Sequence, residues 1–446
     1  MRIEPKMQDP NIRINNFEEV NLGYTEEEAI AEAKRCRLCG VCVKGCPVGI
    51  DIPAFINSIA KGKFRQAIDI IRQFSVLPAV CGRVCPQENQ CEKQCILSRK
   101  GEPINIGALE RFVADKFSEK ESFDIPIVEK SAGIIGSGPA GLTAAYELRK
   151  AGFDVTIYES LHAAGGVLRY GIPNFRLPDK IIDQELEYLL NLGVKLQLNF
   201  LVGKTVYINE LLEIHDGLLI ATGAGLPSRL NIPGENGVGV FLANEFLTRI
   251  NLMHAYEFPL YHTPIKQFTK TVVVGGGNVA MDCARVAKRL GADVTIVYRR
   301  EEEDMPARRE ERIHGKEEGI KFITLANPVE IILDDYKNVK GIKLEKMKIA
   351  GKGLDGRNKI EGTLEYFNLD ADAIIVAIGQ IPNKIISENV KGLNFDSHGR
   401  VIVDENLKTS LNRVWAAGDI VTGAATVILA MGEAKRAAAD MIKTLL

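Results

Sequence analysis

The chain has 446 residues, a length typical of roughly two to four domains. Hydrophobic residues make up 46% of it and charged residues 26%, which excludes a mostly disordered chain, a collagen-like fibre and a small disulfide scaffold. The formal net charge is −2, so the charge does not indicate a nucleic-acid partner or an anionic membrane surface. The N-terminus lacks the apolar core of a signal peptide and no apolar run is long enough to span a bilayer, so we expect a cytoplasmic protein.

Eight of the nine cysteines lie within residues 36–95, which in a cytoplasmic chain indicates metal binding rather than disulfides. The first four have the spacing of a bacterial ferredoxin run and are Cys36, Cys39, Cys42 and Cys46. The second set is Cys81, Cys85, Cys91 and Cys95. Eight sulfurs suffice for two [4Fe–4S] clusters. A pair of zinc sites is the alternative, but zinc sites favour separated CxxC pairs, often with His, and this segment contains no His.

Residues 1–120 therefore predict a helical iron–sulfur domain. Helical patches are expected at residues 25–34 and 52–72, and Thr25 and Glu28 have the spacing of a capping box. The charged stretch 116–126 ends in proline, which is typical of a linker.

From residue 133 onward the chain repeats itself. Residues 133–160 and 272–299 align at a constant offset of 139. Each copy predicts a strand, a glycine turn, an Ala-rich helix and a second strand. Two such βαβ units imply two Rossmann-like dinucleotide-binding domains with parallel sheets, so the fold class is α/β.

The first copy contains a glycine turn that would hold a pyrophosphate on the helix N-terminus, formed by Gly136, Gly138, Pro139, Ala140 and Gly141. The glycines allow a tight turn, close approach of the backbone to the phosphates, and close helix–strand packing. Glu159 ends the next strand, where its carboxylate can accept hydrogen bonds from ribose hydroxyls and would repel a 2′-phosphate. This copy suits FAD or NAD rather than NADP.

The second copy has its own turn, formed by Gly275, Gly277, Asn278, Val279 and Ala280. Arg299 and Arg300 stand where the first copy has its acid, and guanidinium groups bind a 2′-phosphate well, which favours NADP(H). Alternatively, the two arginines pair with the acidic residues 301–304 on a solvated surface. Arg308 and Arg309 are further candidates for the 2′-phosphate, and Cys283 is expected to be a core thiol.

Several motifs together are specific for one family: Gly-Arg-Val-Cys85-Pro86, the stretch 165–178, Ala221-Thr-Gly223, Tyr298-Arg-Arg-x4-Met305-Pro, and Trp415-Ala-Ala-Gly418-Asp419. On these the chain resembles the small (β) subunit of bacterial glutamate synthase. The same family includes the large subunit of NADH-dependent ferredoxin:NADP oxidoreductase and the N-terminal half of dihydropyrimidine dehydrogenase.

The resemblance implies a discontinuous FAD domain, residues 127–245 and 376–446, with an NAD(P) domain inserted at 246–375. It implies further FAD contacts at Gly165, Gly166, Arg176, Val202, Thr222, Gly223, Gly418, Asp419 and Thr426. Ile378 and Gly379 would lie beside the nicotinamide. One cluster would take Cys36, Cys39, Cys42 and Cys95, and the other Cys46, Cys85, Cys91 and Glu110. Cys81 would then be a bystander.

The resemblance also implies an electron-transfer oxidoreductase in which NADPH exchanges electrons with FAD, and the two clusters connect FAD to an outside acceptor. We expect no acid–base catalytic residue, because the cofactors carry the chemistry. A glutamate synthase large subunit, a small flavin and [2Fe–2S] subunit, or free ferredoxin or polysulfide would each fit as partner.

Four other functions compete with this one. A disulfide reductase needs a cysteine pair beside the flavin, but only Cys283 follows residue 95. A complete glutamate synthase needs more residues than the chain has. A wiring subunit with unused nucleotide sites, or the large subunit of an electron-bifurcating complex, remains as an alternative.

Overall fold

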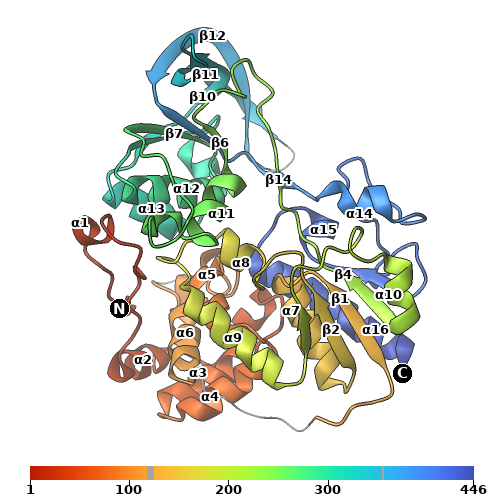
Figure 1. The fold of residues 1–446 in the computed structure, drawn as a ribbon. Helices are drawn as coiled ribbons and strands as arrows, with labels where there is room; N and C mark the ends of the chain where they lie inside the picture. Colours follow the sequence, from red (N-terminus) through yellow and green to blue (C-terminus); the bar gives the residue numbers. More distant parts are fainter. Residues whose placement is uncertain (100, 118–124, 354–355) are drawn as a thin grey trace.

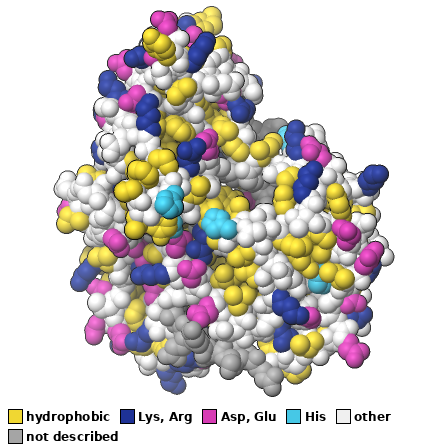
Figure 2. Space-filling model, in the orientation of Figure 1, with side chains coloured by type: hydrophobic (Ala, Val, Ile, Leu, Met, Phe, Trp, Pro, Cys, Tyr) yellow, Lys and Arg dark blue, Asp and Glu magenta, His cyan; other side chains and the backbone are white. Residues whose placement is uncertain are grey.

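The computed structural model describes residues 1–99, 101–117, 125–353 and 356–446, and has a mixed α/β architecture (Figure 1). An N-terminal arm and a helical unit lie beside two parallel β-sheets, and a three-stranded antiparallel sheet projects from one end. On the face in Figure 2, Lys and Arg side chains are interspersed with Asp and Glu, and hydrophobic side chains gather near the middle. No helix in the described ranges is long and apolar enough to cross a membrane.

The helical unit is built from α2 (Glu26–Ala33), α3 (Ile52–Ala60), α4 (Phe64–Arg72), α5 (Pro78–Val84) and α6 (Ile106–Lys116). The capping box at Thr25 and Glu28 is confirmed, since each accepts a hydrogen bond from the other's backbone N–H. The patch expected at 52–72 is two helices, because the chain turns at Gly62, whose φ is +70°. Phe55, Ile59 and other apolar side chains of these helices form the core of the unit. Most of the linker expected at 116–126 lies outside the described residues.

The first sheet has the order β15-β4-β1-β2-β3, with every pairing parallel. Its strands are β1 (Ser131–Ile135), β2 (Asp154–Tyr158), β3 (Lys195–Gln197), β4 (Gly217–Ile220) and β15 (Val414–Ala416). Helix α7 (Pro139–Lys150) connects β1 to β2 and packs against α16 (Val427–Leu445). The last strand and helix of this layer therefore come from the end of the chain.

The second sheet has the order β6-β13-β7-β8-β9 and is also parallel. Its strands are β6 (Val240–Leu242), β7 (Lys270–Val274), β8 (Asp293–Val297), β9 (Lys321–Ile323) and β13 (Ala373–Val376). Helices α11 (Ala243–Asn251), α12 (Asn278–Arg289) and α13 (Arg309–Glu317) accompany it. Because β6 pairs with β13, this sheet begins before the expected boundary at residue 245, which falls inside α11.

The predicted repeat is confirmed residue for residue: β7, α12 and β8 begin and end 139 positions after β1, α7 and β2. The chain passes between the two sheets through two short strands, β5 (Leu226–Pro227) and β14 (Gln380–Ile381), which pair antiparallel. The three-stranded antiparallel sheet consists of β10 (Ala326–Leu333), β11 (Val339–Lys352) and β12 (Asn358–Asp370). Cys283 is a fully buried core residue of α12, as expected.

Candidate functional site

The first glycine turn brings the start of α7 against the end of β1. A Cβ on Gly141 would lie 1.9 Å from the carbonyl oxygen of Gly136, so only glycine permits this approach of helix and strand. Gly136 has a φ of +105°, and a Cβ there would lie 2.5 Å from the carbonyl oxygen of Ala221. Gly138 caps the helix N-terminus. Bare backbone around a helix N-terminus is the arrangement that accepts a pyrophosphate, so these residues fit a dinucleotide.

Glu159 is held at the carboxyl end of β2 by hydrogen bonds to the same turn. Its carboxylate accepts from the backbone N–H and the hydroxyl of Ser137, at 2.9 and 2.5 Å, and from the N–H of Leu161 at 2.8 Å. The Ser137 hydroxyl also accepts from the N–H of Gly165 at 3.1 Å. Ser137 thus ties three segments of the candidate FAD site together.

Other expected FAD contacts converge on this edge of the sheet. Gly166 packs on the turn, since a Cβ there would lie 2.9 Å from the Cα of Gly138. Gly418 approaches the start of α7 in the same way, with 3.0 Å between its added Cβ and the Cβ of Ala140. Thr222 and Gly223 follow β4, and buried Val202 packs in an apolar cluster with residues at the ends of β1 and β2.

The region where α16 begins completes this edge. Thr426 caps α16, accepting a hydrogen bond from the N–H of Leu429 at 3.3 Å. Burial raises the pKa of Asp419 to about 6, and the nearby Glu433 carboxylate adds to the rise while the Ala425 N–H opposes it. The Glu433 carboxylate accepts from the N–H of Gly418 at 2.9 Å. Nothing in the sequence pattern singled out Glu433, because its contact joins segments that are separated along the chain.

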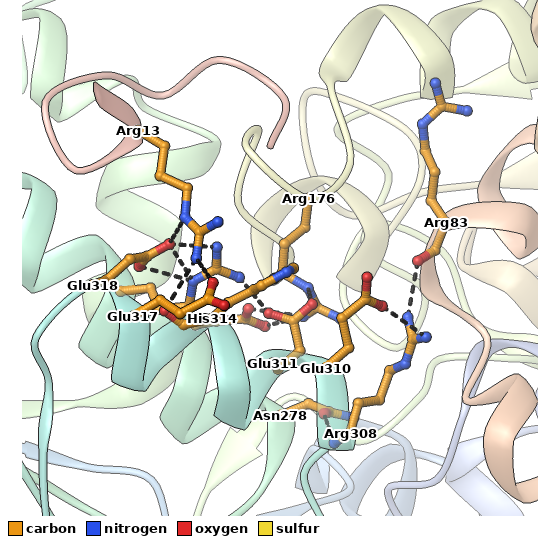
Figure 3. Close-up of polar contacts among 12 residues, drawn as sticks. Arg13, Arg83, Arg176, Asn278, Arg308, Glu310, Glu311, His314, Glu317 and Glu318 are labelled. Carbon is orange, nitrogen blue, oxygen red and sulfur yellow. Dashed lines mark hydrogen bonds and ion pairs between the residues drawn. The ribbon is translucent and has the colours of Figure 1, made fainter. Parts of the chain in front are cut away.

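Arg176 lies in a different environment from the other residues assigned to FAD. Its guanidinium donates to both oxygens of Asp282 at 2.7 and 2.8 Å, and its Nε lies 2.8 Å from Glu311. Burial opposes its positive charge, but these two carboxylates outweigh burial and raise the pKa of Arg176. Figure 3 shows the side chain beside residues of α13. The guanidinium is thus engaged with the second nucleotide-binding unit, and its contact with FAD stays a prediction.

The second glycine turn is built like the first. Gly275 has a φ of +144°, and a Cβ there would lie 2.2 Å from the carbonyl oxygen of Ala377. Gly277 caps α12, which begins with Asn278, Val279 and Ala280. Ile378 and Gly379 follow β13 at the same edge, and Ile378 is 43% exposed. This edge also offers open backbone at a helix N-terminus.

The two arginines after β8 do not pair with the neighbouring acidic run. Arg299 is exposed and its side chain has no hydrogen bond or ion pair with any described residue. Arg300 donates from Nε to the carbonyl oxygen of Asn358 at 2.8 Å. Among the acids, Glu302 pairs instead with Lys316 at 2.7 Å. Arg299 is therefore free to meet a phosphate.

Arg308 points away from the nucleotide edge and toward the iron–sulfur domain (Figure 3). Its guanidinium donates to the carbonyl oxygen of Arg83 and to the side-chain oxygen of Gln87, both at 3.0 Å. It is buried, whereas the neighbouring Arg309 is exposed. The guanidinium of Arg308 is thus engaged in a contact between domains, and its contact with a 2′-phosphate stays a prediction.

The first group of thiols consists of Cys36, Cys39, Cys42 and Cys95, of which Cys42 and Cys95 are buried. Burial raises the pKa of Cys42 to about 12, and the nearby Cys36, Cys39 and Cys95 thiols add to the rise. Residues from 36–42, 53–56, 95–97 and 104–106 line one small cavity that includes these thiols. Cys39 is exposed. The four cysteines thus line a common space, as the ligands of one cluster must.

The second group lies deeper and consists of Cys46, Cys85, Cys91 and Glu110. Burial raises the pKa of Cys46 to about 11, with further contributions from the nearby Glu110 and Cys85. Glu110 is buried and its Oε1 has no hydrogen-bond partner; burial, then the Glu185 carboxylate, raise its pKa to about 8. A buried carboxyl oxygen without a partner is costly, and ligation to iron would satisfy it, so these residues fit a cluster.

Cys81 lies beside this second group without belonging to the expected ligand set. Its thiol is fully buried, next to Cys85 and 3.6 Å from the sulfur of Met431 on α16. Within the described ranges, no group of three or more His, Cys, Asp or Glu side chains is arranged to hold a metal ion. Each corner of a cubane cluster binds its own iron, so cluster ligands lie farther apart than the ligands of a single ion.

Helix α16 joins the candidate FAD site to the iron–sulfur domain. A Cβ on Gly432 would lie 2.8 Å from the carbonyl oxygen of Pro47, the residue after Cys46. Lys435 donates to the carbonyl oxygen of Phe74 at 2.9 Å. The helix that begins at the candidate FAD site therefore packs directly against the loop that carries Cys46 of the second thiol group.

A buried network of charges fastens α12 and α13 to the rest of the molecule (Figure 3). Glu318 accepts from Arg13 of the N-terminal arm at 2.8 Å, and from Arg285 and Arg289 of α12 at 2.7 and 2.9 Å. Burial opposes ionisation of Glu318, but the arginines outweigh burial and lower its pKa to about 2. No sequence motif indicated this network, because Arg13 lies 305 residues from Glu318 along the chain, and Arg285 and Arg289 lie 33 and 29 residues from it.

The architecture of two parallel sheets with glycine turns defines a flavin- and nicotinamide-dependent oxidoreductase. A pyridine nucleotide-disulphide oxidoreductase model matches residues 130–434, and a model for dihydropyrimidine dehydrogenase domain II, 4Fe-4S cluster, matches residues 13–122. The chain is 33% identical to the glutamate synthase [NADPH] small chain of Escherichia coli, over 98% of this chain and 96% of that one. The chain therefore belongs to the glutamate synthase small-chain family of NAD(P)H-dependent flavin oxidoreductases with a 4Fe–4S domain.

Other relatives extend this picture. The chain is 37% identical to the NADP(+)-dependent formate dehydrogenase subunit beta of Moorella thermoacetica, over 90% of this chain but only 59% of that one. FprA of Mycobacterium tuberculosis, solved in complex with NADPH, has a TM-score of 0.60 at 22% identity, over 71% of this chain and 84% of that one. Thioredoxin reductase of T. acidophilum has a TM-score of 0.51 at 21% identity, over 70% and 98%. These structures show the shared fold.

Proposed function

We propose that the chain is an oxidoreductase subunit of the glutamate synthase small-chain type, moving electrons between NADPH and a partner subunit or carrier through FAD and two [4Fe–4S] clusters. When bound, FAD exchanges two electrons with a nicotinamide and single electrons with a cluster. The observation that carries the proposal is the course of α16. It begins with Thr426 at the flavin edge and packs through Gly432 against Pro47, beside the second thiol group.

The exposure of individual thiols supports an order for the two clusters. Cys81, Cys85 and Cys91 of the deeper region are buried, and Met431 of α16 touches Cys81. Cys39 of the first group is exposed. The deeper group is thus the one next to FAD, and the first group is the one from which an outside acceptor is reached. Glu110 completes the deeper set, because its carboxyl oxygen has no other partner.

The nucleotide is NADPH rather than NADH. Arg299 is exposed and unpaired within the described residues, at the strand end where the first unit has Glu159. A free guanidinium at this place binds a 2′-phosphate by charge-assisted hydrogen bonds, and an acid would repel it.

The names of the relatives support a partner subunit. The E. coli relative is the small chain of a glutamate synthase, and the M. thermoacetica relative is subunit beta of a formate dehydrogenase. No part of this chain is left for ammonia or glutamate chemistry, so a partner supplies the final acceptor. A large subunit with a glutaminase domain, or a small flavin and [2Fe–2S] subunit of a bifurcating complex, would be recognised by co-purification.

The test is an anaerobic titration of the purified chain with NADPH and, separately, NADH, followed by visible absorbance and low-temperature EPR. NADPH is expected to bleach the flavin at lower concentration than NADH, and the reduced protein is expected to give cubane signals with about eight irons per chain. A bound flavin that neither nucleotide reduces would contradict the proposal and favour a wiring subunit with unused nucleotide sites.

An Arg299→Ala variant tests the nucleotide assignment. Loss of a charge-assisted bond to the phosphate predicts a roughly 10- to 100-fold higher KM for NADPH, with the KM for NADH unchanged. Lys348→Ala, an exposed change on β11 of the same part of the chain, is the matched control. An unchanged preference for NADPH over NADH in Arg299→Ala would show that another residue binds the 2′-phosphate.

A further inference from the structure

The loops that carry the first thiol group have an unusual charge. Residues 34–46 and 93–99 contain six basic residues and no acidic residue, although the whole chain has a net charge of −2. The six are Lys34, Arg35, Arg37, Lys44, Lys93 and Arg99. Each lies within four residues of Cys36, Cys39, Cys42 or Cys95 in the sequence. The positive charge is therefore gathered along the two loops that carry this group of thiols.

Five of these six side chains are exposed and unpaired. Arg35 binds Glu32 and the carbonyl oxygens of Glu102 and Pro103. The other five make no side-chain hydrogen bond or ion pair with any residue the structure describes. Exposed lysines elsewhere do find acids: Lys195 pairs with Asp154 at 2.8 Å. The fold thus does not use these five charges to hold itself together.

The exposed edge of the thiol group lies on these basic loops. Cys39 is exposed, and Leu38 beside it is 47% exposed with a φ of +53°. Arg37, Cys39 and Cys95 line the same small cavity, so the two basic loops meet there. An apolar contact surrounded by charged side chains is the usual anatomy of a protein interface.

We propose that this basic rim, formed by Lys34, Arg37, Lys44, Lys93 and Arg99 around Leu38 and Cys39, is the docking surface for an acidic protein that carries a one-electron centre. The inference rests on the proposed function, because the surface matters only if electrons pass through the first cluster. In each encounter one electron passes between that cluster and the carrier's centre, so one is oxidised and the other reduced. No bond forms or breaks, and NADPH supplies two electrons for two encounters.

Charge complementarity is the reason for choosing an acidic carrier. Exposed charges of one sign steer an oppositely charged protein to the site and raise its association rate by about 10- to 1,000-fold at low salt. They would repel a basic carrier equally. Because the screening length is about 10 Å at 0.1 M salt, the attraction must weaken as salt is added.

The experiment uses the intact, cluster-loaded chain and an acidic two-[4Fe–4S] ferredoxin as the probe. Binding is measured by calorimetry at about 0.05 M and about 0.3 M salt. The double variant Lys34→Glu/Arg99→Glu is expected to weaken binding at least about ten-fold at low salt and to flatten the salt dependence. The control Lys348→Glu/Lys359→Glu makes the same charge change on exposed residues of β11 and β12, and is expected to bind like the unaltered chain.

Carbodiimide cross-linking maps the contact directly, because it joins carboxylates of the ferredoxin to lysines of the chain. Cross-links are expected at Lys34, Lys44 or Lys93. If Lys34→Glu/Arg99→Glu fails to take up its clusters, Lys44→Glu/Lys93→Glu replaces it. Wild-type affinity in the loaded variant, or cross-links confined to other lysines, would overturn the docking surface.

A second readout separates this inference from the proposed function. NADPH is expected to reduce flavin and clusters equally in the unaltered chain, the rim variant and the control. If NADPH reduces the clusters of the unaltered chain but the ferredoxin binds the rim variant as well, only the docking surface fails. If NADPH leaves the clusters of the unaltered chain oxidised, the proposed function fails, whatever the binding shows.

Discussion

The two βαβ units have identical element lengths but are held in the molecule by opposite means. Helix α7 of the first unit packs through apolar side chains against α16, inside the largest hydrophobic core. Helix α12 of the second unit carries the buried charges Asp282, Arg285 and Arg289, at positions where α7 has Thr143, Tyr146 and Lys150. The comparison teaches that a glycine turn and its helix are specified locally, whereas the attachment of the unit is specified by residues far away in the chain.

The two strand ends differ in the same way. Glu159 is buried and bonded to its own turn through Ser137, whereas Arg299 is exposed and has no partner among the described residues. In the first site the side chain at the strand end is held by its own turn, whereas in the second site it is exposed to solvent and available to bind a ligand. This agrees with a resident flavin and an exchanging nucleotide.

The largest expected effect comes from breaking the polar attachment of the second unit with Glu318→Gln. Removing the carboxylate leaves three buried arginines without their shared partner, so we expect a loss of about 3 kcal/mol in the free energy of unfolding. Glu317→Gln is the matched control, since Glu317 also pairs with Arg13 but is half exposed. The measurement is urea unfolding followed by the fluorescence of Trp415, the only tryptophan of the chain.

The same variant carries a pH prediction. The pKa of Glu318 is lowered to about 2 in the folded protein, against an ordinary value of 4.5. Its stabilising contribution is therefore fully present above about pH 4.5 and is lost as the pH falls toward 2. The deficit of Glu318→Gln should shrink as the pH is lowered through this window. A deficit that stays constant would mean that packing, not charge, holds Glu318 in place.

A smaller effect is expected from substitutions at the third glycine position of each motif, which is Gly141 in the first unit and Ala280 in the second. Gly141→Ala places a Cβ 1.9 Å from the carbonyl oxygen of Gly136 and should cost about 2–3 kcal/mol, with loss of bound flavin. The second unit already has Ala280 at this position, so Ala280→Gly should cost only about 1 kcal/mol. Thermal unfolding and the ratio of flavin to protein absorbance measure both. Equal costs in the two units would contradict the closer approach of α7 to its turn.

The smallest effect is expected from Glu159→Gln. The amide keeps the shape of the side chain but replaces one carboxylate oxygen with a donor facing hydrogen-bond donors of its own turn, a cost of about 1–2 kcal/mol. Flavin affinity should fall while NADPH affinity stays unchanged, because the change touches only the first unit. Parallel titrations of the flavin-free protein with FAD, and of the loaded protein with NADPH, would show whether the two sites are independent.

The sequence was most informative where structure is local. The offset of 139 residues predicted both glycine turns and their strands, because a βαβ unit is fixed by a short stretch of chain. It was least informative for Arg176 and Arg308. Both residues belong to, or lie close to, a sequence motif, but their partners lie over a hundred residues away. Arg176 pairs with Asp282 and Glu311. Arg308 binds Arg83 and Gln87. No period or spacing relates such segments.

The contact between Gly432 and Pro47 has a consequence for the rate of electron transfer. Electron tunnelling between two centres slows exponentially with the thickness of protein between them. At Gly432 the helix that starts at the flavin edge lies against the loop of Cys46 with no side chain in between, and even one Cβ would lie 2.8 Å from the Pro47 carbonyl oxygen. Under the proposed function, the absence of a side chain at Gly432 keeps the layer of protein between the candidate FAD site and the second thiol group thin.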